Sequence, residues 1–329
     1  MPRPAAPPSL PLTNSCNLDY LRPTNTSMRI EGIVISCYRF DVELARICVA
    51  SIRYWYPHVS IWLLKDHQYG DFSTTEIEQY WNVQVYPTCR KKLGWGGGKL
   101  EVLTELPARR FLFLDSDTAF SGRVFEHLES FDENMIVENK DYVAVGEVES
   151  QFFSLDGIQQ LDPTFQFPGI GFNTGQFVAT TGLITKEDLD GFLDWQTLTL
   201  KHPEVFKMGE QGLLNYVVLR KLQQGELTLR REPLVVWPGA AHRANHIQVA
   251  DLTSDSKHLQ VIHWAGLRWG KTPDEMLRSD ILLYFERIYY DRIPLGAWLR
   301  KWRRARFQIN RELVTPLKTL AKKALSRFR

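Results

Sequence analysis

The stretch FLFLDSDTAF, residues 111–120, places four apolar side chains directly before Asp115 and Asp117. Residues 110–115 predict the most apolar strand of the chain, and this composition is typical of a central strand covered on both faces. The two aspartates either cap a turn or hold a divalent metal ion. In a parallel sheet, ligands bind beyond the carboxyl ends of the strands, which is where this pair falls.

Apolar runs alternate with helical patterns on both sides of this strand. Further strands are predicted at 30–38, 60–66, 83–87, 142–148, 171–182 and 259–266, and helices at 41–56, 74–81, 99–106, 186–200 and 210–222. This alternation indicates an α/β fold with a mostly parallel central sheet flanked by helices.

The chain has 329 residues and 44% hydrophobic content, which suffices for one large α/β domain. Residues 1–28 are rich in Pro, Ser, Thr and Asn and predict a flexible leader, without the apolar core of a signal peptide. The main domain is expected at 29–290 and a basic amphipathic tail at 291–329. Eighteen uncharged apolar residues never occur in succession, so no membrane-spanning helix is expected.

The four cysteines, Cys16, Cys37, Cys48 and Cys89, have no metal-binding spacing. Such sparse use predicts free thiols in a reducing compartment, and we expect a cytoplasmic protein.

The charge of the chain is unevenly distributed. Residues 297–329 carry eleven Lys or Arg and one acid, a net charge of +10, so the rest of the +2 chain carries −8. Trp298, Trp302 and Phe307 lie among these bases, and a basic amphipathic helix with aromatic residues is typical of peripheral binding to the anionic inner face of a membrane. A solvated terminus and a helix packed on the domain are the alternatives. Nucleic-acid binding is not expected, because the acidic body would repel a duplex.

Five segments, in the expected order, resemble the GT-A glycosyltransferases of family 8, which include glycogenins and bacterial lipopolysaccharide galactosyltransferases. They are GGKLEVLTEL (97–106), FLFLDSDTAF (111–120), GFNTGQFVATTG (171–182), GEQGLLNYVV (209–218) and VIHWAG (261–266). The resemblance covers roughly residues 29–270. It implies a GT-A (Rossmann-like) catalytic domain that transfers a hexose from a UDP-sugar to a carbohydrate, glycolipid or protein acceptor.

The resemblance implies that Asp115, Asp117 and His263 bind Mn²⁺ or Mg²⁺. An imidazole nitrogen beside two carboxylates suits Mn²⁺. A divalent cation at this position would neutralise the diphosphate of the donor as the glycosidic bond breaks.

Donor-binding residues are also implied by the resemblance. Tyr38 would stack on the uracil, or else pack in the core. Lys99 would reach the donor phosphates or sugar, or else begin a helix in solvent. Asn173 and Thr174 would bond the sugar hydroxyls, or else pair with nearby backbone.

The phosphates are expected to lie near the end of the last matched segment. Gly266 would let the backbone approach the diphosphate. The family often has a lysine three residues after this glycine, but Trp269 stands there. The phosphate contact therefore falls to Lys271 or to Arg268.

The segment Glu210-Gln211-Gly212 stands where the family has Asp-Gln-Asp. In the family, Gln211 would line the face of the anomeric carbon. A neutral amide is a poor nucleophile, so we expect retention by a front-face reaction in which the departing diphosphate helps to deprotonate the acceptor. Glu210 acts at the site or caps the helix.

Two alternative functions remain open on the sequence. One is an inverting transferase with Glu210 or Glu149 as the general base. The other is a non-catalytic nucleotide-sugar-binding protein, which the missing acid at Gly212 favours.

Overall fold

The computed structural model describes residues 29–86, 97–105, 108–142, 144–197, 199–239, 243–253, 255–267 and 270–314. The predicted leader, Cys16, Cys89, Arg268 and the end of the tail from residue 315 lie outside the described residues.

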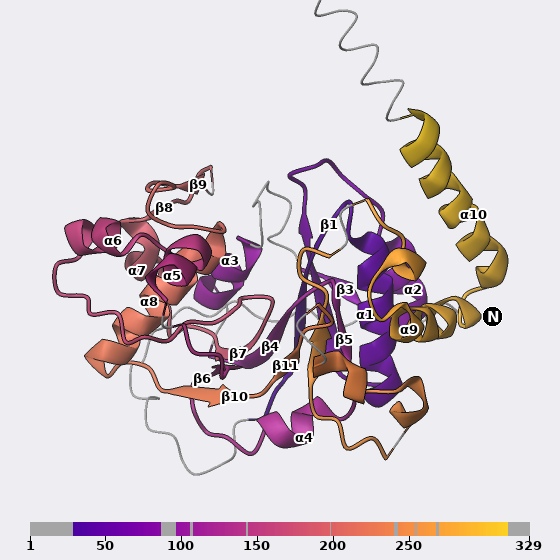
Figure 1. The fold of residues 1–329 in the computed structure, drawn as a ribbon, viewed down its shortest axis with the longest axis horizontal. Coiled ribbons are helices and arrows are strands. Elements are labelled where there is room, and N and C mark those ends of the chain that lie inside the picture. The colour runs from indigo at the N-terminus through magenta and orange to yellow at the C-terminus, as the bar shows by residue number, and fades with distance from the viewer. Residues whose placement is uncertain are drawn as a thin grey trace, which may run out of the picture.

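A seven-stranded sheet forms the centre of the molecule, in the order β10–β6–β7–β4–β1–β2–β3 (Figure 1). Its strands are β1 (Gly32–Tyr38), β2 (Ser60–Asp66), β3 (Gln84–Val85), β4 (Arg110–Asp115), β6 (Met135–Glu138), β7 (Gln176–Thr180) and β10 (Leu229–Glu232). All neighbouring pairs are parallel except the two that involve β7. The predicted α/β fold with a mostly parallel sheet is confirmed.

The reversed direction of β7 has a direct effect on the site. Because β7 runs antiparallel to β4, its start lies beside the end of β4, with Gln176 opposite Leu114. The polar residues at 173–176 therefore meet the aspartates that follow β4.

A second, three-stranded sheet joins β11 (Val235–Val236), β12 (Val261–His263) and β5 (Thr118–Phe120). β12 is antiparallel to β5, and His263 pairs with Thr118. A short hairpin of β8 (Leu193–Asp194) and β9 (Thr199–Leu200) lies apart from both sheets.

Helices cover both faces of the large sheet (Figure 1). The α-helices are α1 (Val42–Trp55), α2 (Thr75–Trp81), α3 (Gly98–Glu105), α4 (Val124–Leu128), α5 (Val145–Gln151), α6 (Leu155–Leu161), α7 (Lys186–Asp190), α8 (Glu210–Gln224), α9 (Ser279–Asp291) and α10 (Gly296–Ile309), with short 3₁₀ turns at Arg243–His246, Val249–Asp251 and Pro273–Glu275 and a π turn at Asn310–Val314.

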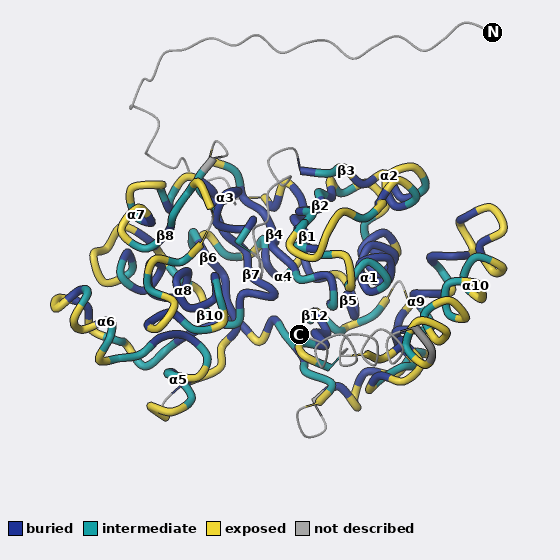
Figure 2. The backbone as a smooth tube through the Cα atoms, turned by 90° about the horizontal axis from the view of Figure 1, so that it is seen from above, coloured by how far each residue is buried: buried dark blue, intermediate teal, exposed yellow. Residues whose placement is uncertain are grey.

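Strand β4 is buried on both faces, as its composition predicts. Leu112 and Leu114 belong to the core that includes α1 and α9, whereas Phe111 and Phe113 belong to the core that includes α3 and α8. In Figure 2 the central strands are dark blue, and exposed backbone is concentrated in the outer helices and loops.

The predicted strand at 142–148 is wrong, because α5 begins at Val145. A strand with one covered face would bury alternate residues, but Ala144 and Gly146, which would share the face of the buried Val148, are exposed. The valines suggested a strand, but the buried Val148 and Phe152 lie four residues apart, which fits one face of a helix.

The predicted helix at 186–200 is right only for its first five residues, α7. The helix ends at Asp190, and the Asp194 side chain at the end of β8 accepts hydrogen bonds from the backbone amides of Gln196 and Thr197, which closes a hairpin turn. The chain then returns as the β8–β9 hairpin.

Candidate active site

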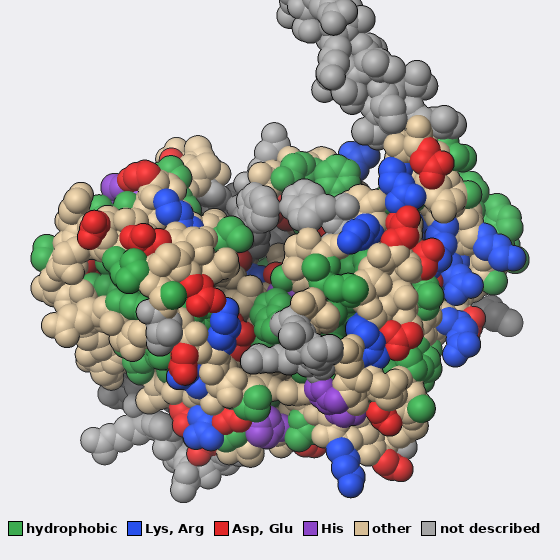
Figure 3. All heavy atoms as spheres, viewed as in Figure 1, with side chains coloured by type: hydrophobic (Ala, Val, Ile, Leu, Met, Phe, Trp, Pro, Cys, Tyr) green, Lys and Arg blue, Asp and Glu red, His purple; other side chains and the backbone are tan. Residues whose placement is uncertain are grey.

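A cavity of about 1320 Å³ lies at the carboxyl edge of the large sheet. Tyr38, Asp66 and Asp115, which end β1, β2 and β4, all line it. Figure 3 shows this face hollowed between the two halves of the molecule. The expectation that a ligand site lies beyond the strand ends fits this position.

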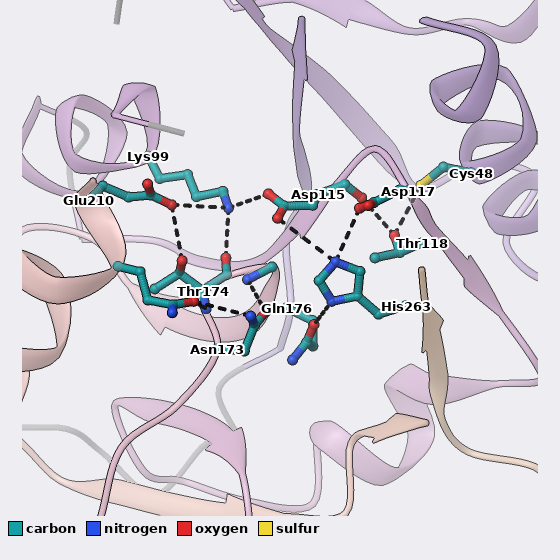
Figure 4. A network of polar contacts seen from close by, with 12 residues as sticks. Cys48, Lys99, Asp115, Asp117, Thr118, Asn173, Thr174, Gln176, Glu210 and His263 are labelled. Carbon is teal, nitrogen blue, oxygen red and sulfur yellow. Dashed lines mark hydrogen bonds and ion pairs between the residues drawn. The ribbon is translucent and has the colours of Figure 1, made fainter. Parts of the chain in front are cut away.

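Three side chains from the two sheets converge on the floor of this cavity (Figure 4). His263 Nε2 lies 3.1 Å from Asp117 Oδ1 and 3.9 Å from Asp115 Oδ2. One ligand atom from each of the three residues lies within 4.8 Å of the others. The β12–β5 pairing thus brings together the three residues predicted as metal ligands.

Gln176 holds the His263 ring in one orientation. His263 Nδ1 and Gln176 Oε1 are 2.7 Å apart, and both side chains are buried. Since an amide oxygen can only accept, Nδ1 carries the hydrogen and Nε2 faces the aspartates. In this neutral tautomer the buried Nε2 is an acceptor that faces the carboxylate oxygens of Asp117 and Asp115 at 3.1 and 3.9 Å. A buried nitrogen so placed fits a ligand to a metal ion.

The electrostatics of the floor also fit a cation. Burial lowers the pKa of His263, but the carboxylates of Asp117 and Asp115 outweigh burial and raise the pKa above its usual value. The negative potential that favours a proton there favours a divalent cation as well. Two carboxylates and one imidazole form a donor set that Mn²⁺ accepts, so the residues fit the implied metal.

Lys99 is buried beneath the floor, and the alternative of a solvated lysine is wrong. Its Nζ donates to Asp115 Oδ1 at 2.5 Å and to the Thr174 carbonyl at 2.6 Å. Burial lowers the pKa of Lys99, but Asp115 and Glu210 outweigh it and raise the pKa, so the ammonium stays charged. Lys99 reaches the cavity through these partners, because its own side chain is not part of the lining among the described residues.

Glu210 faces this ammonium from the first turn of α8. Its Oε1 lies 3.8 Å from Lys99 Nζ and accepts a hydrogen bond from Thr174 Oγ1 at 3.0 Å. These contacts place the carboxyl group in the polar cluster, and its hydrogen bond to its own backbone amide also fits the helix-capping alternative. Burial raises the pKa of Glu210 to about 7, although Lys99 opposes the shift. A carboxyl group that titrates near neutrality can exchange a proton with a ligand.

Asn173, Thr174 and Gln211 form the adjoining wall. Gln211 Oε1 accepts from Asn173 Nδ2 at 3.1 Å and from the Thr174 amide at 3.2 Å, while Gln211 Nε2 donates to the Gln151 carbonyl at 3.0 Å. All three residues line the cavity. Because the Gln211 oxygen already accepts two hydrogen bonds, it is an even poorer nucleophile than a free amide.

Glycines allow this close packing. Gly209 has φ +63° and ψ −122°, a conformation that glycine adopts readily, and it starts α8. A Cβ on Gly212 would lie 2.0 Å from the Phe152 carbonyl oxygen. A Cβ on Gly175 would lie 2.2 Å from His263 Cε1. Packing therefore explains why position 212 is a glycine, so this glycine is weaker support for a non-catalytic protein.

The far end of the cavity is aromatic. The rings of Tyr38 and Phe40 lie 5.7 Å and 5.4 Å from that of Tyr69, centroid to centroid, and all three residues line the cavity. Phe40 and Tyr69 are 56% and 44% exposed. Tyr38 thus faces the cavity and not the core. Exposed rings at a cavity edge can stack on a flat base.

Gly266 and Lys271 also line the cavity. Gly266 has φ +70°, in the left-handed region that favours glycine.

The carboxylates of α5 differ in their positions. Glu147 lines the cavity and pairs with Lys140 at 2.5 Å. Glu149 accepts a hydrogen bond from the Leu155 amide at 3.4 Å and does not belong to the lining among the described residues. The alternative of Glu149 as a general base is therefore not supported by its position.

Comparison with known proteins places this geometry in a known fold. The chain superposes on the bifunctional glycosyltransferase WbbM with a TM-score of 0.54 at 14% sequence identity, over 85% of this chain and 52% of WbbM. This is a glycosyltransferase fold. The chain spans about half the length of WbbM, and at this identity the likeness concerns the fold alone.

Two other glycosyltransferases align with lower scores. GlyE of Streptococcus pneumoniae aligns at TM-score 0.48 and 15% identity, over 84% of this chain and 64% of GlyE. The galactosyltransferase LgtC, solved with donor and acceptor sugar analogs, aligns at TM-score 0.46 and 14% identity, over 77% of this chain and 94% of LgtC. No protein-family model and no curated protein sequence matches the chain.

Sequence reasoning missed several residues of the site. Gln176 stood inside a quoted strand, and its signal was an amide in an otherwise apolar run. Phe40 and Tyr69 gave no signal, because a surface aromatic residue has no spacing that separates it from ordinary packing.

Proposed function

We propose that the chain is a metal-dependent glycosyltransferase that moves a hexose from a UDP-sugar to a hydroxyl of a carbohydrate, glycolipid or protein acceptor. The observation that carries the proposal is the Asp115–Asp117–His263 group on the floor of a large cavity in a glycosyltransferase fold. A cytoplasmic location belongs to the same proposal, since Cys37 and Cys48, the two cysteines among the described residues, are not joined in a disulfide.

Asp115, Asp117 and His263 would hold Mn²⁺, or Mg²⁺, which when bound supplies Lewis-acid stabilisation of the departing diphosphate. Lys99 holds one Asp115 oxygen in a hydrogen bond, so that the other can face the metal position. Gln176 keeps His263 Nε2 aimed at the same point.

The donor would lie along the cavity from the aromatic end to the amide wall. Tyr38 stacks on the uracil, and Lys271 with the Gly266 backbone contacts the phosphates. Asn173 and Thr174 then bond the sugar hydroxyls. The supporting observation is that all five residues line one continuous cavity.

Retention by a front-face reaction fits this wall best. Gln211 presents a hydrogen-bonded amide, and no negative charge, to the anomeric carbon. The departing diphosphate would then take the acceptor proton, while Gln211 and Asn173 hold the sugar in place.

An inverting reaction with Glu210 as the general base is the second candidate. Its supporting observation is the pKa of about 7, which suits proton abstraction at neutral pH. The anomeric configuration of the first-formed product, followed by NMR, separates the two reactions.

The proposed function is tested by UDP release from a panel of UDP-sugars with and without Mn²⁺. We expect release with one or two donors, and a loss of about a thousandfold or more in Asp117→Ala, because one metal ligand is removed. The exposed Asp156 offers a matched control, and Asp156→Ala should keep full activity. Undiminished turnover by Asp117→Ala would show that Asp117 does not hold a metal ion that the reaction needs.

A further inference from the structure

The amphipathic helix α10 has its polarity reversed relative to an ordinary surface helix. Two of its arginines face the domain: Arg303 pairs with Glu76 of α2, and Arg304 pairs with Glu286 of α9 at 2.7 Å. Leu299 packs against the core on the same side. A helix on a soluble domain normally turns its apolar face inward and its charges outward.

The outward face of α10 is correspondingly apolar. Leu295, Trp298, Trp302 and Ile309 are 80%, 62%, 44% and 54% exposed. Their spacing of three, four and seven residues places them on one stripe of the helix. The rings of Trp298 and Trp302 stack with centroids 6.4 Å apart. Figure 3 shows green and blue side chains gathered along the edge of the molecule where α10 runs.

Leu295, at the start of this stripe, has a strained backbone conformation. Its φ is +56°, in the left-handed region that costs a branched apolar residue energy. A glycine would relieve that strain. A leucine held there and mostly exposed points to a use for its side chain outside the domain.

We propose that this stripe, Leu295–Trp298–Trp302–Ile309, binds the surface of an anionic lipid bilayer. Tryptophan is favoured at the level of the lipid headgroups, where its ring is buried and its N–H stays wet. Lys301 and Arg306 are exposed beside the stripe, and the Arg306 guanidinium lies 5.3 Å from the Trp302 ring. Residues 315–329 add five Lys or Arg and no acid in sequence.

Charge favours a bilayer over a second copy of the chain. Two copies joined by this stripe would bring the same cations together, which repel each other. The charge of an anionic bilayer is opposite to that of these cations, and its apolar interior can bury the indole rings. Among the described residues, no helix is long and apolar enough to cross a membrane.

The position of α10 links this surface to the cavity. Phe307 lines the cavity, and Arg311 just beyond the helix donates to the Gly270 carbonyl at 3.0 Å. A bilayer against the outer stripe would therefore lie next to the cavity rim. A lipid-borne acceptor would be presented there, and this last step alone rests on the proposed function.

Binding to vesicles tests the proposal without any turnover. The full chain is floated with phosphatidylcholine vesicles that contain or lack phosphatidylglycerol. We expect binding to the anionic vesicles, weakened roughly tenfold or more by Trp298→Ser with Trp302→Ser, because each indole loses on the order of 100 Å² of apolar contact. Val145→Ser is the matched control, since Val145 is 59% exposed on α5, across the molecule from α10 (Figure 1).

Quenching of tryptophan fluorescence by brominated acyl chains gives a second readout on the unmodified chain. We expect quenching that the double variant loses. Three results would overturn the proposal: no binding of the intact chain to anionic vesicles, unchanged binding of the double variant, or a dimer in solution that the double variant abolishes. The second result would assign binding to residues 315–329, and the third would assign the stripe to a second copy.

Discussion

The two ends of the cavity are built in different ways. At the floor, Lys99, Glu210 and His263 come from three elements, α3, α8 and β12, and each is buried and hydrogen-bonded to another side chain of the site. At the aromatic end, Phe40 and Tyr69 are about half exposed and contact one another and Tyr38 through ring packing. The floor is rigid because each polar group there depends on the next, whereas the aromatic end can lose a member without exposing a charge.

The largest effect is expected from removing the central charge of the floor. Lys99→Met would leave the buried Glu210 and the partly exposed Asp115 without their cation, so we expect a loss of about 3 kcal/mol in the free energy of unfolding, the lower end for a buried pair because Asp115 keeps part of its hydration. Urea denaturation measures it. Lys140→Met is the control, because its pair with Glu147 is partly exposed and should contribute less than about 1 kcal/mol. Equal losses in the two variants would contradict a special role for the buried lysine.

Glu210 makes the floor sensitive to pH. Its pKa rises from 4.5 to about 7 on folding, so between these values the folded chain keeps a proton that the unfolded chain releases. The folded state is therefore destabilised as pH rises from 4.5 to 7, on the order of 3 kcal/mol in total, and the cost persists above pH 7. Glu210→Gln should remove this component.

The measurement is the difference in unfolding free energy between the wild type and Glu210→Gln at several pH values, in the presence of a chelator. We expect this difference to move against the wild type as pH rises. A difference independent of pH would show that Glu210 is ionised throughout and would remove the support for its role as a base.

Gln176 tests how the floor orients a metal ligand. Gln176→Leu keeps the volume but frees His263 Nδ1, so we expect Mn²⁺ affinity to fall by about 10–100-fold. Binding of Mn²⁺ by electron paramagnetic resonance reports this without turnover. Gln176→Glu, which restores an acceptor, should recover part of the affinity, while Gln159→Leu on the surface of α6 should leave it unchanged. Equal affinity in Gln176→Leu and the wild type would rule out the orienting role.

The smallest effect is expected at the aromatic end. Phe40→Ala with Tyr69→Ala removes stacking surface, so KM for the donor should rise about 2–10-fold with kcat nearly unchanged. Stability should change by less than about 0.5 kcal/mol, as usual for surface positions. If kcat fell as much as it does in a variant of the floor, the aromatic end would not differ from the floor in its role, and the comparison would be wrong.

Local patterns were enough to predict most of the fold. β2 at 60–66 and the start of α8 at Glu210 match their predictions, because apolar period and turn residues act within a few positions. The valines before Phe152 suggested a strand, and only the packing of Val148 decides for α5. Predictions failed where tertiary contacts overrode short apolar runs.

For the site as well, some residues could be predicted from local sequence and others depend on tertiary contacts. Asp115, Asp117 and His263 could be named because their residue types carry metal chemistry and because a family resemblance ordered them. The burial of Lys99 and the contact of Gln176 with His263 could not be predicted, because both depend on β7 running against β4. No sequence pattern within residues 171–182 indicates that β7 runs antiparallel to β4.

The tight contact at Gly212 limits which residues this position can carry without a change elsewhere in the chain. Proteins that the chain resembles carry an acid at the corresponding position, but here a Cβ would meet the Phe152 carbonyl at 2.0 Å. An acid at position 212 would therefore require the backbone near Phe152 and Lys207 to move. A designed chain that is to carry an acid there needs a second change that shifts this backbone.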